Sequence, residues 1–406
     1  MTERVHTNAQ WKEMRFDEFF DMLPTNTLSR DKLNSQRGDY QNIHYGDVLI
    51  KYPYCLDCNN NEIPYINDGV KFNTTEVKDG DVIFADTAED DTVGKCVEVL
   101  NVGDRRIVSG LHTYFCRPKC KMAPGYLGYF LNSDHFHNQL LPYIAGSKVS
   151  SVNRTSISRT YIFYPDSPSA QSRIAAILSS TDKVITSTQK VIAKYKQMKQ
   201  GLMEDLLKPK EGWKMVELEK VGEINPNNKE SIPNQFIYID LESVVAGKLL
   251  SENHILKKDA PSRAQRLVYN NDVLYQTVRP YQKNNYIHKK VGSYVASTGY
   301  ALIRCKAGYN PDYVYYLFHT HSFESIVMGL CTGTSYPAIA PNNLKRIEIA
   351  VPFKNGKPNL AEQCRIATIL SGIDVKIAAE ERVLEKYNLI KKGLMERLLN
   401  ELKMNN

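Results

Sequence analysis

The sequence lacks the long apolar run that a membrane-spanning helix requires. In its 406 residues, no stretch approaches the roughly 18 consecutive apolar residues of a transmembrane helix, so we expect no membrane partner. The first residues, MTERVHTNAQWKEMRF, are polar and charged and have no secretory pattern. We therefore expect a cytoplasmic protein whose eight scattered cysteines are free thiols, because disulfides are rare in that compartment.

Several catalytic motifs are also absent. The chain has no GxxxxGK[ST] phosphate loop, no glycine-rich cofactor turn after a strand and no HExxH metal pair. The run Asn225-Pro226-Asn227-Asn228 lacks the second proline and the aromatic residue of an amino-methyltransferase loop. These absences argue against a motor and against a methylase. We expect no catalytic residue, no metal and no cofactor in this chain.

Two weaker patterns leave other chemistry open. Asp68, Glu76 and Lys78 have the spacing of a metal-dependent nuclease triad, a triplet that often arises by chance. A possible structural zinc site would use four thiols with plausible spacing: Cys55, Cys58, Cys116 and Cys120. The net charge of +7 permits a polyanionic partner without requiring one.

The most informative feature of the sequence is a repeated phrase. KQGLMEDLL runs from Lys199 to Leu207, and KKGLMERLL runs from Lys391 to Leu399, 192 residues later. The similarity extends without a gap over 171–207 and 363–399, where about half of the positions are identical. Neither copy holds a catalytic group, so the phrase must matter for the structure that it builds.

Both copies have the apolar periodicity of long helices. We place a central helix at 167–208, with Ser167-Pro168 at its start, and a C-terminal helix at 359–403, with Asn359 and Glu362 at its start. Each is about 39 residues, or roughly 58 Å, long. Because such helices are unstable alone, we expect them to pair as an antiparallel coiled coil.

The spacing of 3 and 4 residues defines the expected seam. In the central helix it includes Ile174, Ile177, Thr181, Val184, Thr188, Val191, Tyr195, Met198 and Leu202, with Leu178, Ile185 and Ile192 widening the stripe. In the C-terminal helix it includes Ile366, Ile369, Ile373, Val383, Tyr387, Ile390 and Leu394. We attribute Gly201 and Gly393, which lie inside the repeated phrase, to close approach at a helix crossing. The residues expected to pair the helices or contact a partner are Ile174, Leu178, Tyr195, Gly201, Leu202, Met203, Ile366, Leu370, Tyr387, Gly393, Leu394 and Met395.

The segments between the helices also resemble each other, more faintly. Residues 1–166, here called the first head, and 212–358, the second head, both open with a Trp-Lys phrase. Each then has short strand-like runs (GDVLI, DGDVIFADT and NNDVLYQTV), a late helical stretch, and a polar loop before a strand that ends in proline. The sequence thus predicts an α+β protein with two similar globular α/β domains separated by two long helices.

This layout resembles the DNA-specificity subunit of type I restriction-modification systems, and the resemblance covers essentially the whole chain. Its most specific signals are GLMEDLL and GLMERLL, the phrases RIAAILSSTD and RIATILSGID, and the closing run GTS…LKRIEIAVP. The resemblance implies that each head is a target-recognition domain for one half of a split, asymmetric double-stranded DNA sequence. It also implies that the helices set the gap between the halves and dock two methyltransferase subunits.

The resemblance places the chemistry in other chains. The partner methylases would bind S-adenosylmethionine and methylate adenine N6, and a separate restriction and motor subunit would use ATP and Mg. The chain itself would be non-catalytic. The alternatives are an assembly scaffold that binds no DNA, or the metal-dependent nuclease considered above.

Candidate DNA contacts combine basic, amide and hydroxyl side chains in polar loops. The second head offers Arg279, Tyr281, Lys283, Asn284, Asn285, Lys289 and Lys290 in one run, and Thr334, Ser335 and Tyr336 in its closing loop. The first head offers Ser147, Lys148 and Arg154 in the equivalent closing loop. The middle of the first head is acidic, in the run ADTAEDDTVGK, and we expect that run to face water.

Overall fold

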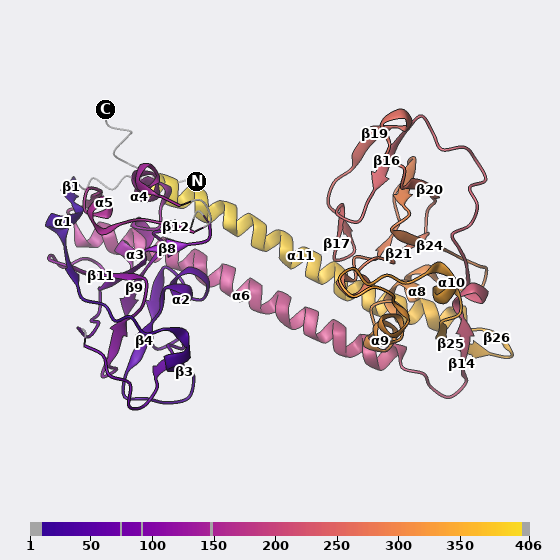
Figure 1. Cartoon of the computed structure of the whole chain (residues 1–406), viewed down its shortest axis with the longest axis horizontal. Helices are drawn as coiled ribbons and strands as arrows, with labels where there is room; N and C mark the ends of the chain where they lie inside the picture. Colours follow the sequence, from indigo (N-terminus) through magenta and orange to yellow (C-terminus); the bar gives the residue numbers. More distant parts are fainter. Residues whose placement is uncertain (1–9, 74, 91, 147–148, 400–406) are drawn as a thin grey trace. The chain divides into compact units, whose positions relative to one another are not determined.

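The chain folds into two compact units (Figure 1). The computed structural model describes residues 10–399 except 74, 91, 147 and 148. The first unit is Met1–Gln189 with Arg382–Asn406, and the second unit is Lys190–Glu381. Each unit therefore combines one head with the beginning of one long helix and the end of the other.

The two long helices are α6 (Pro168–Leu207) and α11 (Leu360–Leu399). The Ser167 hydroxyl accepts a hydrogen bond from the Ala170 N–H at 3.4 Å, and the Asn359 side chain accepts one from the Glu362 N–H at 3.2 Å. Both helices thus begin at a side-chain cap, as the sequence predicts. α6 ends before Pro209, which has no N–H with which to continue the helix.

The helices run antiparallel inside each unit. In the second unit, the Lys199 ammonium lies 2.6 Å from Asp374, and the Lys196 ammonium lies 3.3 Å from Glu381. The later residue of α6 therefore pairs with the earlier residue of α11, as expected for antiparallel helices. None of the helices in the described part of the chain is long and apolar enough to cross a membrane.

The buried stripe of α6 is offset from the predicted seam. Thr181 and Thr188 are buried as expected, but Val184, Val191 and Met198 are 36%, 38% and 42% exposed. Their neighbours Ile185 and Ile192 are buried instead. The same offset leaves three residues of α11 exposed: Ile369, Val383 and Ile390. Two adjacent apolar heptad positions give the same periodicity, so spacing alone does not select the buried one.

The prediction of a close helix crossing at Gly201 and Gly393 is wrong. A Cβ atom placed on either glycine would meet no heavy atom within 4 Å beyond its own helix backbone. The residues that follow do pack, because Met203 joins the core of the second head while Leu394 and Met395 lie against the core of the first. The repeated phrase therefore anchors each helix end on a head.

Most of the other residues that were expected to pair the helices or contact a partner pack into the hydrophobic cores of the heads instead. Ile174 and Leu178 belong to the first-head core, and Ile366 and Leu370 belong to the second-head core. The half-buried members of the set are Tyr195, Leu202 and Tyr387. Thus, each helix contributes its beginning to one hydrophobic core and its end to the other.

The first head contains two main sheets. The five-stranded sheet has the order β2 (Phe20–Leu23), β11 (Thr113–Pro118), β7 (Val82–Ala85), β9 (Cys96–Leu100) and β5 (Cys55–Asp57). The four-stranded sheet has the order β10 (Ile107–Ser109), β4 (Gln41–Ile43), β6 (Tyr65–Ile66) and β3 (Leu33–Asn34). Two-stranded pairs join β1 (Trp11–Arg15) to β13 (Tyr161–Pro165) and β8 (Thr87–Ala88) to β12 (Ser150–Ser151).

The helices of the first head are short. They are α1 (Phe16–Phe19), α2 (Tyr45–Ile50), α3 (Tyr126–Phe130), α4 (Asp134–Leu140) and α5 (Arg154–Ile157). The 3-10 turns are η1 (Arg30–Lys32) and η2 (Leu141–Tyr143). The late helical stretch is confirmed by α3 and α4. GDVLI is not a strand, because the His44 side chain accepts from the Gly46 N–H and caps α2 there.

The second head repeats this arrangement with different loops. One sheet has the order β15 (Gly222–Ile224), β24 (Tyr300–Cys305), β21 (Val273–Gln276) and β22 (Tyr286–Ile287). The other has the order β19 (Asn253–Leu256), β16 (Gln235–Ile239), β23 (Tyr294–Ser297) and β20 (Ala264–Val268). A third sheet joins β14 (Trp213–Glu217), β25 (Glu348–Lys354) and β26 (Lys357–Pro358), and β17 (Val244–Val245) pairs with β18 (Lys248–Leu249).

The helices of the second head are α7 (Leu218–Val221), α8 (Pro311–Leu317), α9 (His321–Leu330) and α10 (Pro341–Lys345), with 3-10 turns η3 (Lys257–Asp259) and η4 (Pro280–Gln282). Equivalent bonds mark the duplication. The Tyr126 hydroxyl donates to the Phe163 carbonyl at 2.8 Å, and the Tyr313 hydroxyl donates to the Ala350 carbonyl at 2.8 Å. The two heads therefore share a buried framework although their surfaces differ.

Candidate nucleic-acid interface

The Arg279 loop, residues 277–285, connects β21 to β22 in the second head. Arg279 and Lys283, on either side of η4, both have a φ of 53° in the left-handed region. That backbone conformation costs a non-glycine residue about 1 kcal/mol or more, and such residues concentrate at functional sites. The surrounding structure must therefore hold this loop in place.

Gln276 supplies much of that restraint from beneath the loop. Its side chain is buried, and its amide nitrogen donates to the Val278 carbonyl and to the Gln282 side chain, both at 2.8 Å. Its amide oxygen accepts from the Asn284 N–H at 3.0 Å. A buried amide with both ends satisfied fixes the loop because breaking any of these bonds leaves an unpaired polar group.

A second loop meets the first. The Tyr336 loop, residues 332–338, is closed by a bridge between Thr332 and Ala338, and Val278 bridges to Ala338 from the Arg279 loop. The Arg279 N–H donates to the Pro337 carbonyl at 2.7 Å, and the Arg279 guanidinium lies 4.3 Å from the centre of the Tyr336 ring. The structure thus brings together two segments that the sequence indicates separately.

The exposed side of these loops carries aromatic and hydroxyl groups. Tyr336 is 65% exposed and Tyr281 is 47% exposed. Thr334 and Ser335 are exposed next to Tyr336. Rings and hydroxyls of this kind suit contacts with bases and phosphates.

The lysines predicted beside Arg279 are engaged within the protein. Lys283 pairs with Glu324 at 2.8 Å, Lys289 with Asp312 at 2.9 Å, and Lys290 with Glu252 at 2.5 Å. The hydrogen bond with Glu252 raises the pKa of Lys290. A phosphate would have to compete with these carboxylates, so the lysines add less positive charge than the sequence suggests.

The two predicted asparagines also hold the protein together. The Asn284 side chain accepts from the Ala246 N–H at 3.2 Å. Asn285 is 1% exposed and accepts from the Gln276 N–H at 2.9 Å. The burial of Asn285 removes it from any base contact in this conformation. The sequence pattern does not reveal that Asn285 is buried, because a polar run contains the same residue types whether its amide side chains are buried or exposed.

The first head presents a different surface at the equivalent place. A buried aspartate precedes each central strand and pairs with an arginine at 2.7 Å: Asp81 with Arg117, and Asp272 with Arg304. On this alignment Ala85 stands where the second head has Gln276, and Ala88 stands where it has Arg279. The first head therefore has neither the loop support nor the arginine.

The predicted contacts of the first head are only partly described. Ser147 and Lys148 lie outside the described residues. Arg154 is exposed at the start of α5, and its guanidinium donates to the Met22 carbonyl at 3.3 Å. Nearby, Asp86 lies 3.3 Å from the His112 ring, and burial raises the pKa of that carboxyl group.

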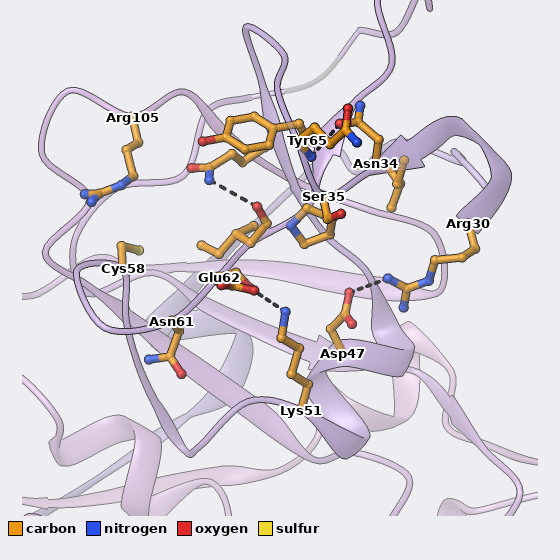
Figure 2. A pocket seen from close by; sticks show the side chains of 15 residues that line it. Arg30, Asn34, Ser35, Asp47, Lys51, Cys58, Asn61, Glu62, Tyr65 and Arg105 are labelled. Atoms are coloured by element: carbon orange, nitrogen blue, oxygen red, sulfur yellow. Dashed lines mark hydrogen bonds and ion pairs between the residues drawn. The ribbon is translucent and has the colours of Figure 1, made fainter.

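The first head contains a polar cavity of about 540 Å³, and Figure 2 shows the side chains that line it. Its lining includes Arg30, Asn34, Lys51, Asn61 and Arg105. Arg30 pairs with Asp47 at 2.8 Å, and Lys51 donates to the Glu62 carbonyl at 2.7 Å. The cavity therefore mixes donors and acceptors, and Lys51 and Arg105 bind neutral oxygens there rather than carboxylates. Sequence patterns do not indicate this cavity, because its lining residues come from separate short segments.

The alternative chemical sites do not assemble. Cys58 lies in one core cluster of the first head, whereas Cys116 lies in another with Cys55 beside it, and Cys120 is exposed. Glu76 of the nuclease pattern pairs with Arg106 at 2.9 Å. Within the described ranges, no group of three His, Cys, Asp or Glu residues is placed to hold a metal ion.

The family model for the type I restriction modification DNA specificity domain matches residues 8–197 and 210–388. A relative from Methanocaldococcus jannaschii, the type I restriction enzyme MjaX specificity subunit, is 26% identical over 347 residues, which cover 79% of this chain and 77% of the relative.

Two solved structures share the fold. The S subunit of a type I restriction-modification system from M. genitalium matches with a TM-score of 0.59 and 12% identity, over 98% of each chain. A chain from a structure of type I R-M complex assembly matches with a TM-score of 0.55 and 17% identity, over 97% of this chain and 98% of that one.

Proposed function

This chain belongs to the type I restriction modification DNA specificity family, and on that premise we propose that its two heads read the two halves of a split, asymmetric DNA target. The observation that supports asymmetry is the contrast between the heads. They share a buried framework, yet the strained loop with Arg279 and Tyr336 in the second head has no counterpart in the first. Different reading surfaces on equivalent scaffolds select different half-sites.

We also propose that the long helices dock the methylating subunits of the system. The support is an exposed apolar set that recurs at intervals of seven residues along α6, namely Val184, Val191 and Met198. The equivalents of Val191 and Met198 in α11 are Val383 and Ile390, which are exposed to a similar extent. Exposed apolar residues in a regular row are typical of a binding surface. Because the row is duplicated, it fits two copies of one partner.

The chemistry of the system is assigned to those partners. We propose that the methylase subunits bind S-adenosylmethionine and modify adenine N6, and that a restriction subunit uses ATP and Mg. The specificity chain then selects the site and catalyses no step. Its isolated form should transfer no methyl group from S-adenosylmethionine to DNA.

The test is selection from a random duplex DNA library by the purified complex of this chain with its methylating subunits. The proposal predicts one enriched motif with two different short half-sites separated by a fixed gap of unspecified bases. A palindromic motif would contradict the asymmetry. A complex that retains duplexes without any sequence preference would contradict the reading function itself.

A further inference from the structure

The Arg279 guanidinium has N–H groups that donate no hydrogen bond to the described residues. Its neighbours Lys283, Lys289 and Lys290 are all paired with carboxylates. The Arg279 guanidinium, in contrast, has no hydrogen-bond or ion-pair partner among the residues that the structure describes, and its Nε is buried without one. A guanidinium that is partly desolvated and unpaired needs a ligand to complete its hydrogen bonds.

The same side chain is held before any ligand arrives. Tyr336 stacks on the guanidinium, and the Arg279 backbone is fixed by its bond to the Pro337 carbonyl and by the Gln276 network below it. A free arginine side chain has about 2 kcal/mol of rotamer entropy to lose on binding. The stack removes part of that cost in advance, which favours a geometrically demanding contact.

Two ligands match the planar fork of an arginine: a phosphate group and the O6/N7 edge of guanine. A phosphate site is expected to gather several free cations, but here the three lysines are neutralised by Glu324, Asp312 and Glu252. The exposed ring of Tyr336 lies against the fork instead, and Tyr281, two residues along the chain from Arg279, is also exposed. One unpaired arginine beside an aromatic surface suits contact with a base edge better than contact with the phosphate backbone of DNA.

We propose that Arg279 reads a guanine in the half-site of the second head, and that the ring of Tyr336 positions its guanidinium. The inference rests on the proposed function, because it presumes that the second head meets DNA. The first head has Ala88 at the equivalent position, so the contact belongs to one half-site only. No such arginine contact is assigned to the other half.

The test is the same library selection, performed with four variants of the chain in its complex. Arg279→Lys keeps the charge but loses the fork. Tyr336→Ala loses the stacking ring, and Tyr336→Phe keeps it. Lys354→Gln, at an exposed position of the same head, removes one charge and serves as the matched control. Thermal melting of each variant checks folding.

Arg279→Lys should reduce the preference for guanine at one position by roughly tenfold to hundredfold, the range expected for a lost bidentate base contact. The other half-site and the gap should be unchanged. Tyr336→Ala should weaken the same preference severalfold, whereas Tyr336→Phe and Lys354→Gln should keep it. This pattern separates base reading from a phosphate contact, because the loss of a phosphate contact weakens binding to all sequences alike, whereas the loss of a base contact changes the preference at one position.

Three results would overturn the inference. The first is a wild-type motif without guanine in the affected half. The second is an Arg279→Lys variant that retains the full guanine preference. The third is a uniform loss of affinity across all sequences, which would make Arg279 a phosphate contact. A wild-type complex that selects no motif at all would overturn the proposed function as well, so the two failures are distinguishable.

Discussion

The ammonium group of Lys391 lies 2.7 Å from a carboxylate oxygen of Asp182, so the end of α11 is tied to the beginning of α6 within the first unit. The Tyr129 hydroxyl donates to the other oxygen of Asp182 at 2.8 Å. The second unit contains the same triad, in which Asp374 binds Lys199 at 2.6 Å and the Tyr316 hydroxyl at 2.7 Å. In each triad the lysine and the aspartate come from different helices.

Replacing Lys391 by alanine should destabilise the first unit by about 1–3 kcal/mol. The range lies between the values for exposed and buried ion pairs, because both side chains are about one-fifth to one-quarter exposed, at 19% and 24%. Thermal unfolding followed by circular dichroism measures the effect. The neighbouring Lys392→Ala, at an exposed position, is the matched control. Equal melting of the two variants would show that the triad contributes nothing specific.

Glu98 should make stability depend on pH in an unusual direction. Its carboxylate is buried and accepts hydrogen bonds from the N–H groups of Gly125 and Gly128, yet burial raises its pKa from 4.5 to about 7. Between these values the folded chain holds a proton that the unfolded chain has released. The free energy of unfolding should therefore fall, by up to about 3 kcal/mol, as the pH rises from 4.5 to 7.

The comparison for this prediction is Glu98→Gln, which cannot titrate. Urea unfolding of both proteins at pH 5 and pH 7.5 gives the difference that belongs to Glu98. The variant should have a lower free energy of unfolding than the wild type at both pH values, because its amide cannot accept from both N–H groups. Its free energy of unfolding should not show the additional decrease between pH 5 and pH 7.5 that Glu98 causes in the wild type. Parallel pH dependences in the two proteins would disprove the assignment.

Replacing Gly201 or Gly393 by alanine should stabilise the isolated chain. Both glycines are helical and an added Cβ meets no atom within 4 Å outside the helix, so the gain is about 0.5–1 kcal/mol per site. Thermal melting of the single variants tests this. A lower melting temperature would mean that the added methyl group is not accommodated as the geometry indicates.

A charge in the exposed apolar row should prevent assembly without unfolding the chain. Val191→Glu and Val383→Glu each place a carboxylate at a position that is more than a third exposed. We expect melting within a few degrees of wild type and at least a tenfold loss of affinity for the methylating subunits, as for a central contact of an interface. Lys194→Glu on the exposed surface of α6 is the control. Wild-type affinity in both valine variants would remove the row from the interface.

The sequence was sufficient for the duplicated framework because that framework depends on local signals. The caps at Ser167 and Asn359 and the long apolar periodicity each specify a helix by themselves. The choice between Val191 and Ile192 as the buried residue could not be made, since both fit a spacing of 3 and 4. Only tertiary packing in the folded protein decides which of these two faces is covered.

The candidate interface was predictable in part. Arg279 and Tyr336 were selected by residue type and loop position, and the structure brings them into contact. The carboxylate partners of the three lysines come from elsewhere in the second head: Asp312 is 23 residues from Lys289, Glu252 is 38 from Lys290 and Glu324 is 41 from Lys283. Pairings over such distances are set by the fold, so a basic run in a sequence overstates the charge that it presents.

The role of this chain in choosing the methylated sites is tested by a genome-wide map of N6-methyladenine in cells that contain the methylating subunits, with and without the chain. We predict a split, asymmetric motif that is methylated only when the chain is present, with two different half-sites and one fixed gap. The same methylation pattern in cells with and without the chain would contradict it.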